Sequence, residues 1–188
     1  MLVTTGQLRK LATTEQQLRK SVAAKILHES VIQTSGAWDI FLSHSSMDAE
    51  LVLGVKALLE GHGFSVYVDW IDDPDLIRSR VNKVSANIIR NRMRASTMML
   101  YAHTINSSVS KWCPWELGYF DGRKSGNVFT LPISTEGRSS FKGQEYLELY
   151  PYVDEGLDKG GVNHLWINYD ENRDSVTLAS ARSNTYSL

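Results

Sequence analysis

The stretch WDIFLSHSS, residues 38–46, decides the fold of this protein. Trp38 to Leu42 form a short and nearly all-apolar run, which is typical of a central strand buried on both faces of a parallel sheet. Small polar residues follow directly, where the chain would leave such a strand. Outward from this strand, short apolar runs alternate with amphipathic stretches.

Strand and helix patterns alternate on the carboxyl side of this first strand. Connections between them are short, which predicts right-handed crossovers and an open parallel sheet with helices on both faces. The predicted fold class is therefore α/β, a flavodoxin-like sheet of about five strands. The expected strands lie near residues 64–68, 97–101 and 127–133. The expected helices lie near residues 48–60, with Ser46 or Asp48 as the cap, and near residues 76–92. A polar loop is expected at residues 69–75.

The two ends of the chain fit this core less well. Residues 7–33 have the spacing of one or two amphipathic helices, whose apolar stripe packs either against the domain or against another copy of the chain. Beyond residue 135 the pattern weakens, although VNHLWINYD suits a last edge strand, and the segment after Arg173 suits a partly disordered tail. The predicted division is a helical extension at 1–35, a domain at 36–170 and a tail at 171–188.

Composition excludes several classes of partner. Twenty Lys and Arg residues against twenty-one Asp and Glu residues leave a net charge of −1, so no long-range field favours nucleic acid or a membrane. The single cysteine, Cys113, cannot close an intramolecular disulfide, and no Cys/His cluster has metal-ligand spacing. No apolar run approaches about 18 residues. We expect a cytoplasmic protein without a metal.

The segment SKWCPWEL, residues 110–117, is the best candidate for chemistry. It follows the strand at 97–101, and ligands of open parallel sheets bind at the carboxyl ends of the strands. Pro114 suits the first helical position, which makes Cys113 the expected cap and Glu116 a first-turn residue. Glu116 could merely complement the helix dipole there. Its tryptophan neighbours in the segment favour a ligand site instead, because they can stack on flat rings.

The two quoted segments also resemble a known family. WDIFLSHSS is similar to the first box of Toll/interleukin-1 receptor (TIR) domains, and SKWCPWEL resembles their segment around the catalytic glutamate. The resemblance spans about residues 37–135, and it places the loop Asp69 to Asp75 where TIR domains have their BB loop. Neither the N-terminal helical segment nor the stretch after residue 135 matches the TIR core.

The resemblance implies an enzyme that cleaves NAD⁺, with Glu116 as its catalytic residue. In the enzymatic branch of the family, the matching glutamate contacts the nicotinamide ribose and stabilises positive charge as the N-glycosidic bond breaks. Nicotinamide is already a good leaving group, so one carboxylate suffices and NAD⁺ is a substrate rather than a cofactor. The expected product is ADP-ribose or a cyclic isomer, in bacterial immunity such as Thoeris-type antiphage defence.

Further residues are candidates for substrate binding, each with a plainer structural interpretation. Ser43, His44 and Ser45 could hold phosphate or ribose, or could form a helix-entry cap, and His44 suits a packed residue better than a general base. Asp69 and Trp70 could face the ligand, and Trp70 equally suits a protein interface. The expected binding set is completed by Trp112 and Cys113, although helix capping accounts for Cys113 without a nucleophilic role.

Other interpretations of the sequence remain. A non-catalytic TIR adaptor would self-associate through residues 69–75, and an enzyme too would form a homo-oligomer through this loop and the N-terminal helix. A nucleoside deoxyribosyltransferase-like enzyme would use the same fold and bond type. A receiver domain is discounted, because Ser43 and Tyr101 stand where it needs acidic residues. A basic run on the helix near 76–92 favours a solvated face over a nucleic-acid site; it comprises Arg78, Arg80, Lys83, Arg90, Arg92 and Arg94.

Overall fold

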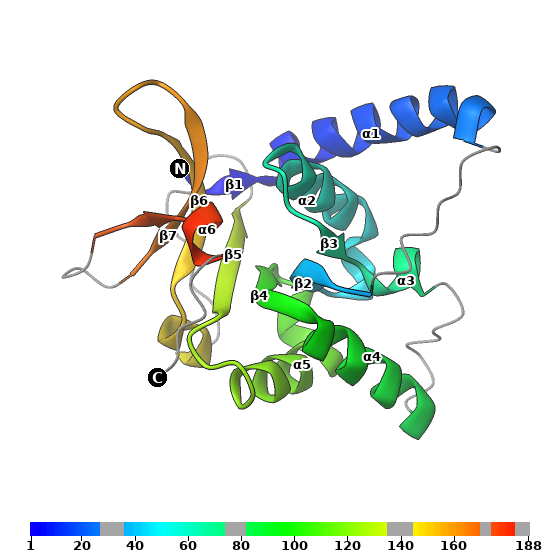
Figure 1. Cartoon of the computed structure of the whole chain (residues 1–188), viewed down its shortest axis with the longest axis vertical. Coiled ribbons are helices and arrows are strands. Elements are labelled where there is room, and N and C mark those ends of the chain that lie inside the picture. The colour runs from blue at the N-terminus through cyan, green and yellow to red at the C-terminus, as the bar shows by residue number, and fades with distance from the viewer. Residues whose placement is uncertain (27–35, 74–81, 135–144, 170–173, 183–188) are drawn as a thin grey trace.

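The computed structural model describes residues 1–26, 36–73, 82–134, 145–169 and 174–182, with residues 17–26 described by their backbone. Over these residues eight strands form one sheet in the order β3-β2-β4-β5-β6-β7-β8, and β1 pairs beside β5 (Figure 1). The strands are β1 (Val3–Thr4), β2 (Trp38–Ser43), β3 (Val66–Tyr67), β4 (Ser96–His103), β5 (Val128–Ser134), β6 (Tyr152–Leu157), β7 (Asn163–Asn168) and β8 (Val176–Thr177).

The five strands β3, β2, β4, β5 and β6 pair in parallel and form the centre of the sheet. From β2 the chain first adds β3 on one side and then crosses to add β4 on the other, so the direction of winding reverses beside β2. This is the topological switch of doubly wound sheets. The predicted flavodoxin-like α/β fold is confirmed, but the sheet is wider than the expected five strands because β1, β7 and β8 extend it.

Helices cover both faces of the sheet, as predicted. The start of α1, with α2 and α6, packs on one face, and α4 and α5 pack on the other (Figure 1). Ile40 and Leu42 of β2 point to the α2 face, while Phe41 between them points to the α4 and α5 face. The helices are α1 (Thr5–Ile26), α2 (Ala49–Gly61), α3 (Asp69–Asp72), α4 (Lys83–Ala95), α5 (Trp112–Asp121) and α6 (Leu178–Ala181), and the 3-10 turns are η1 (Ser46–Asp48), η2 (Ser107–Val109) and η3 (Glu145–Leu149).

The N-terminal helix packs closely against the domain. Leu8 and Ala12 are buried, and α1 crosses α2 at Gly54, where an added Cβ would lie 2.1 Å from the backbone oxygen of Leu8. Only glycine allows this approach of two backbones. The apolar stripe is therefore buried against the domain in its first turns, as one of the two interpretations predicted. The remainder of the predicted helix, at 27–33, lies outside the described residues.

One predicted helix boundary and one predicted loop are wrong. The helix expected from Leu76 begins at Lys83, because Asn82 is extended and its side chain caps the helix by accepting from Ser85 N at 2.9 Å; residues 76–81 lie outside the described ranges. The loop expected at 69–75 contains the short helix α3 over its first four residues. Helix α2 has Asp48 at its N-cap position, but that side chain makes no capping hydrogen bond.

The C-terminal part is more ordered than the sequence indicated. VNHLWINYD forms β7, but this strand lies between β6 and β8 rather than at the edge. Residues 174–182 are not a free tail, since Leu178 and Ala181 of α6 are buried in the core. Strand β6 had no predicted counterpart. Among the helices of the described ranges, none is long and apolar enough to cross a membrane.

Candidate active site at the carboxyl edge of the sheet

Glu116 lies where the topological switch predicts a ligand site. Strands β2 and β4 end side by side, with Ser43 opposite Tyr101, and α5 follows β4. We call the ends of β2 and β4, with the loops that follow them, the carboxyl edge. Glu116 on α5 has no exposed surface, and the Ser43 hydroxyl donates a hydrogen bond of 2.7 Å to its Oε2 atom. The two segments singled out in the sequence thus meet in space.

The position of Glu116 on its helix differs from the prediction. Helix α5 begins at Trp112 with Lys111 at the N-cap, so Cys113 is not the cap and Pro114 is the third residue rather than the first. Glu116 therefore stands in the second turn. The helix dipole acts mainly within the first turn, so it offers a weaker reason for this carboxylate than the sequence suggested. Burial of a carboxylate against a serine hydroxyl needs another explanation.

His44 connects the end of β2 to the segment that follows β3. It is fully buried, with Nδ1 2.9 Å from the Leu42 carbonyl oxygen and Nε2 3.2 Å from the Trp70 indole nitrogen. A carbonyl oxygen can only accept, so Nδ1 donates to Leu42. Asp69 Oδ1 lies 3.3 Å from Nε2. His44 is thus packed and hydrogen-bonded, and its contact with substrate stays a prediction.

The other predicted binding residues differ in exposure, with Ser45 and Cys113 buried and the two tryptophans partly exposed. Ser45 is buried and accepts a hydrogen bond from Met47 N at 3.3 Å, which makes it the cap of η1. Cys113 is fully buried in the core between α5 and the sheet. Trp112 is half-buried and lies edge-on to Trp115, with 5.3 Å between the ring centroids. Trp70 is 38% exposed at the edge. Direct substrate contacts of these residues stay predictions.

Asp48 is a polar residue of the carboxyl edge whose role the sequence did not reveal. Its side chain accepts hydrogen bonds of 2.6 Å from the Thr104 hydroxyl and 2.6 Å from the Asn106 amide. Asp48 is only 6% exposed. The expectation was a helix cap, whereas the carboxylate crosses from the loop after β2 to the loop after β4. Its partners are 56 and 58 residues away in sequence, so no local spacing indicates the contact.

His103, at the end of β4, is a second residue that the sequence did not single out. It is 6% exposed and lies edge-on to the ring of Tyr101. Burial lowers the pKa of His103 from its ordinary value of 6.5 to about 4, because a charged imidazolium would lose its hydration. Burial likewise raises the pKa of the Tyr101 phenol. Both side chains therefore stay neutral near pH 7.

Four residues of the predicted basic run lie on α4, namely Lys83, Arg90, Arg92 and Arg94, while Arg78 and Arg80 lie outside the described residues. Arg92 donates to both carboxylate oxygens of Asp73, at 2.8 and 2.7 Å, and this pairing lowers the pKa of Asp73. The Arg92 guanidinium also lies 5.2 Å from the ring centroid of Trp38. Arg92 thus fastens α4 to the segment after β3. The expectation that the run is a solvated face rather than a nucleic-acid site stays a prediction.

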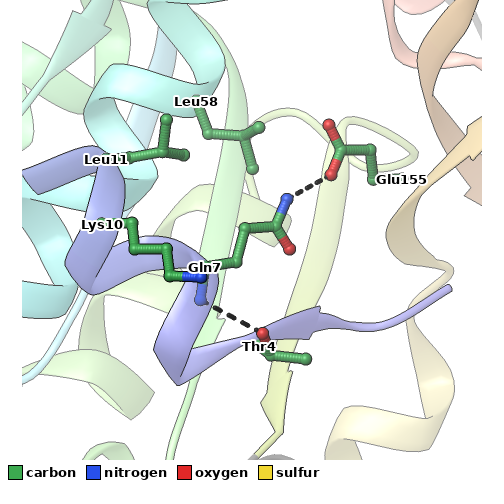
Figure 2. A pocket seen from close by; sticks show the side chains of 6 residues that line it. All are labelled: Thr4, Gln7, Lys10, Leu11, Leu58 and Glu155. Atoms are coloured by element: carbon green, nitrogen blue, oxygen red, sulfur yellow. Dashed lines mark hydrogen bonds between the residues drawn. The ribbon is translucent and has the colours of Figure 1, made fainter. Parts of the chain in front are cut away.

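A pocket of about 400 Å³ lies elsewhere, between α1, α2 and β6. Figure 2 shows Gln7 and Glu155 pointing towards one another across it, joined by a hydrogen bond, with Leu11 and Leu58 on the side of the two helices. Its lining includes no residue of β2, β4 or α5, so it is separate from Glu116. In the part of the chain that the structure describes, no three His, Cys, Asp or Glu residues cluster as metal ligands would.

Together these features define the class of protein: a flavodoxin-like α/β domain with a buried carboxylate at its topological switch. Comparison with known proteins is more specific. A family model of the TIR domain matches residues 40–163. Since the match covers most of the chain, the protein belongs to the TIR domain family. The matched range lies inside the predicted domain at 36–170, and the boundaries of that domain stay predictions. The match runs past residue 135 to residue 163, so the expectation that the TIR resemblance ends near residue 135 is wrong.

Two curated relatives narrow the comparison. One is a probable 3′ cyclic ADP-D-ribose synthase, ThsB′, from Bacillus cereus (strain MSX-D12), which is 49% identical over 133 residues, or 70% of this chain and 68% of that protein. The other is a putative cyclic ADP-D-ribose synthase, TIR2, from Cytobacillus dafuensis. It is 27% identical over 114 residues, which make up 60% of this chain and 30% of that longer protein. The chain is thus similar to bacterial proteins of one named activity.

Proposed function

We propose that this protein cleaves the bond between nicotinamide and ribose in NAD⁺ as part of bacterial immune signalling. The observation behind the proposal is the position of Glu116, a buried carboxylate hydrogen-bonded by Ser43 at the switch point of a TIR domain. The names of the two relatives, both cyclic ADP-D-ribose synthases, support the same substrate.

The chemistry needs one negative charge in the right place. As the C1′–N bond breaks, its electron pair leaves with nicotinamide and neutralises the pyridinium ring, while positive charge develops on C1′ and the ring oxygen of the ribose. A buried carboxylate beside that ribose stabilises the developing charge more than water would, since fewer solvent dipoles screen it. Ser43 holds one oxygen of Glu116 and so fixes the direction of the carboxylate. We propose that no metal takes part, because nicotinamide is a good leaving group and needs no acid to assist its departure.

We propose a cyclic ADP-ribose as the product, with the 3′ isomer as the first candidate. The ribosyl cation reacts with whichever nucleophile is nearest. Water would give ADP-ribose and a proton, whereas a hydroxyl of the same molecule would close a ring and also release a proton. The 49% identity to a probable 3′ cyclic ADP-D-ribose synthase favours the second outcome. An enclosed site such as that around Glu116 also limits the access of water.

Access to Glu116 sets a further condition. The carboxylate has no exposed surface in the single chain, so substrate can reach it only if covering groups move. Trp70, partly exposed and linked to the end of β2 through His44, is well placed to move with the segment after β3. We propose that self-association through residues 69–75 opens or completes the site, with the N-terminal helix as a second candidate contact. Activity should then rise more steeply than protein concentration.

The experiment that tests the proposal compares Glu116→Gln with a matched control. Glutamine keeps the size of the side chain and can still accept from Ser43, so only the charge is lost. Glu148→Gln, an exposed carboxylate on η3, is the control. Each protein is incubated with NAD⁺ at high concentration, and nicotinamide and nucleotides are followed by chromatography and mass spectrometry. The proposal is supported if turnover is lost in Glu116→Gln and kept in Glu148→Gln, and if the product is one water lighter than ADP-ribose.

The same experiment separates the alternatives. A non-catalytic adaptor would assemble without releasing nicotinamide, and Glu116→Gln would assemble equally well. A deoxyribosyltransferase-like enzyme would release bases from deoxynucleosides but leave NAD⁺ intact. Persistent lack of NAD⁺ turnover in the assembled wild type would overturn the proposed function. An unchanged rate in the presence of a chelator is expected, and a loss of rate would overturn the metal-free step.

A further inference from the structure

Asp48 joins the two loops that flank Glu116. It stands at the end of η1, a turn closed by the hydrogen bond from Asp48 N to the Ser45 carbonyl oxygen at 3.0 Å. Its carboxylate reaches across to Thr104 and Asn106, with one oxygen for each donor. Both bonds are short for their types, and a buried carboxylate is costly unless it is satisfied. The loop after β2 is thereby fastened to the loop after β4.

The loop after β4 is itself ordered around Thr104. Thr104 N donates to the Ser107 hydroxyl at 3.1 Å, and Ser107 N donates back to the Thr104 hydroxyl at 3.0 Å. The Ser107 hydroxyl also donates to the Thr104 carbonyl oxygen at 2.9 Å. This loop leads directly into α5, where Cys113 N donates to the Ser110 hydroxyl at 3.3 Å. The position of Thr104 thus influences where α5 begins, and with it where Glu116 stands.

We propose that Asp48 is a positioning residue for Glu116, resting on the proposed function above. By holding the loop after β4 against the loop after β2, Asp48 keeps α5 close enough for the bond between Ser43 and Glu116. Asp48 does not touch the reacting atoms and acts through the loop. A displacement of a catalytic group by about 1 Å can lower a rate by about 100-fold, so a small relaxation of α5 is enough for a measurable effect.

The opposite end of β2 offers a matched control. Asp39 accepts from Ser65 N at 2.7 Å and from the Ser65 hydroxyl at 2.8 Å, and it pairs with Arg182 at 3.0 Å. Like Asp48, it is a carboxylate that ties β2 to another segment with several donors. It lies at the amino end of the strand, away from Glu116. A substitution at either Asp39 or Asp48 should lower stability, whereas only a substitution at Asp48 should lower the catalytic rate.

The test uses Asp48→Asn, Thr104→Val and Asp39→Asn in the full chain. The Asp48→Asn and Thr104→Val variants are expected to lower kcat for nicotinamide release by about 10-fold or more, with KM changed less than about threefold. The double variant should lose little more than the larger single loss, because both changes open the same contact. Asp39→Asn should keep kcat within about twofold. Equal loss of kcat in the Asp39 and Asp48 variants would overturn the proposal.

A second readout does not depend on activity. Hydrogen exchange of peptides covering residues 104–117 should become about tenfold faster in Asp48→Asn, because the bonds from Thr104 and Asn106 to Asp48 protect these amides. In Asp39→Asn the exchange should be unchanged. If the wild type fails to turn over NAD⁺, the proposed function is wrong, yet faster exchange would still show that Asp48 positions α5. Unchanged exchange in Asp48→Asn would overturn the positioning role, even if NAD⁺ turnover is observed.

Discussion

The two ends of β2 use polar residues in opposite ways. At the amino end, the carboxylate of Asp39 is partly exposed, and its partners Ser65 and Arg182 satisfy it without deep burial. At the carboxyl edge, Glu116 and Ser43 have no exposed surface, and Asp48 is nearly as enclosed. Burying ionisable and polar groups costs stability even when they are paired. The polar groups at the amino end of β2 thus stabilise the fold, whereas those at the carboxyl end, which we propose to carry the chemistry, are buried at a cost in stability.

Some of these features could be predicted from the sequence, and others could not. Strands β2, β4 and β5 follow from apolar runs that only a buried strand explains, and Glu116 follows from a motif of the TIR family. The hydrogen bonds of Asp48 join it to partners more than 50 residues away in sequence, and no periodic pattern of residues predicts such a contact. Strand β6 was missed because only Val153 in it is buried, so its apolar signal is weak. Segments as short as β8 and α6 contain too few residues for periodicity.

The largest predicted effect belongs to the carboxyl edge. Glu116→Gln should lower kcat by about 100- to 1,000-fold, because it removes a charge that stabilises the transition state. It should leave the melting temperature equal to or above that of the wild type, since a buried charge is replaced by a neutral amide. Steady-state kinetics with NAD⁺ and thermal unfolding measure the two properties. A strongly lowered melting temperature with retained kcat would mean that Glu116 stabilises the fold and does not take part in the chemistry.

The next effect belongs to the amino end and should appear in stability alone. Asp39→Ala removes the acceptor for Ser65 and Arg182, and we expect a loss of about 1 to 3 kcal/mol in the free energy of unfolding. The turnover of NAD⁺ per folded molecule should stay within about twofold of the wild type. Urea unfolding gives the first quantity and initial rates give the second. A tenfold loss of turnover would mean that the two ends of β2 are not independent.

A smaller effect tests how Glu116 is held. Ser43→Ala removes the hydroxyl that donates to Oε2, so the carboxylate loses its fixed direction but keeps its charge. We expect kcat to fall by about 10-fold or more, but less than for Glu116→Gln, because one hydrogen bond to a charged carboxylate contributes about 1.5 to 3 kcal/mol. Combining Ser43→Ala with Glu116→Gln should add almost nothing to the loss. Additive losses would show that Ser43 acts on the substrate separately.

The smallest effect is a pH dependence that arises at the carboxyl edge. Because the pKa of His103 is lowered to about 4 in the folded protein, the unfolded chain binds a proton between about pH 6.5 and 4 that the folded chain does not bind. Stability is therefore fully present above pH 6.5 and falls as the pH is lowered towards 4. Across this window the wild type should lose on the order of 1 kcal/mol more than His103→Gln, in which this proton is absent. Urea unfolding of both proteins at pH 7 and pH 4.5 measures the difference. Parallel losses would place the imidazole in contact with solvent, and the contrast between the two ends would then rest on Ser43, Asp48 and Glu116 alone.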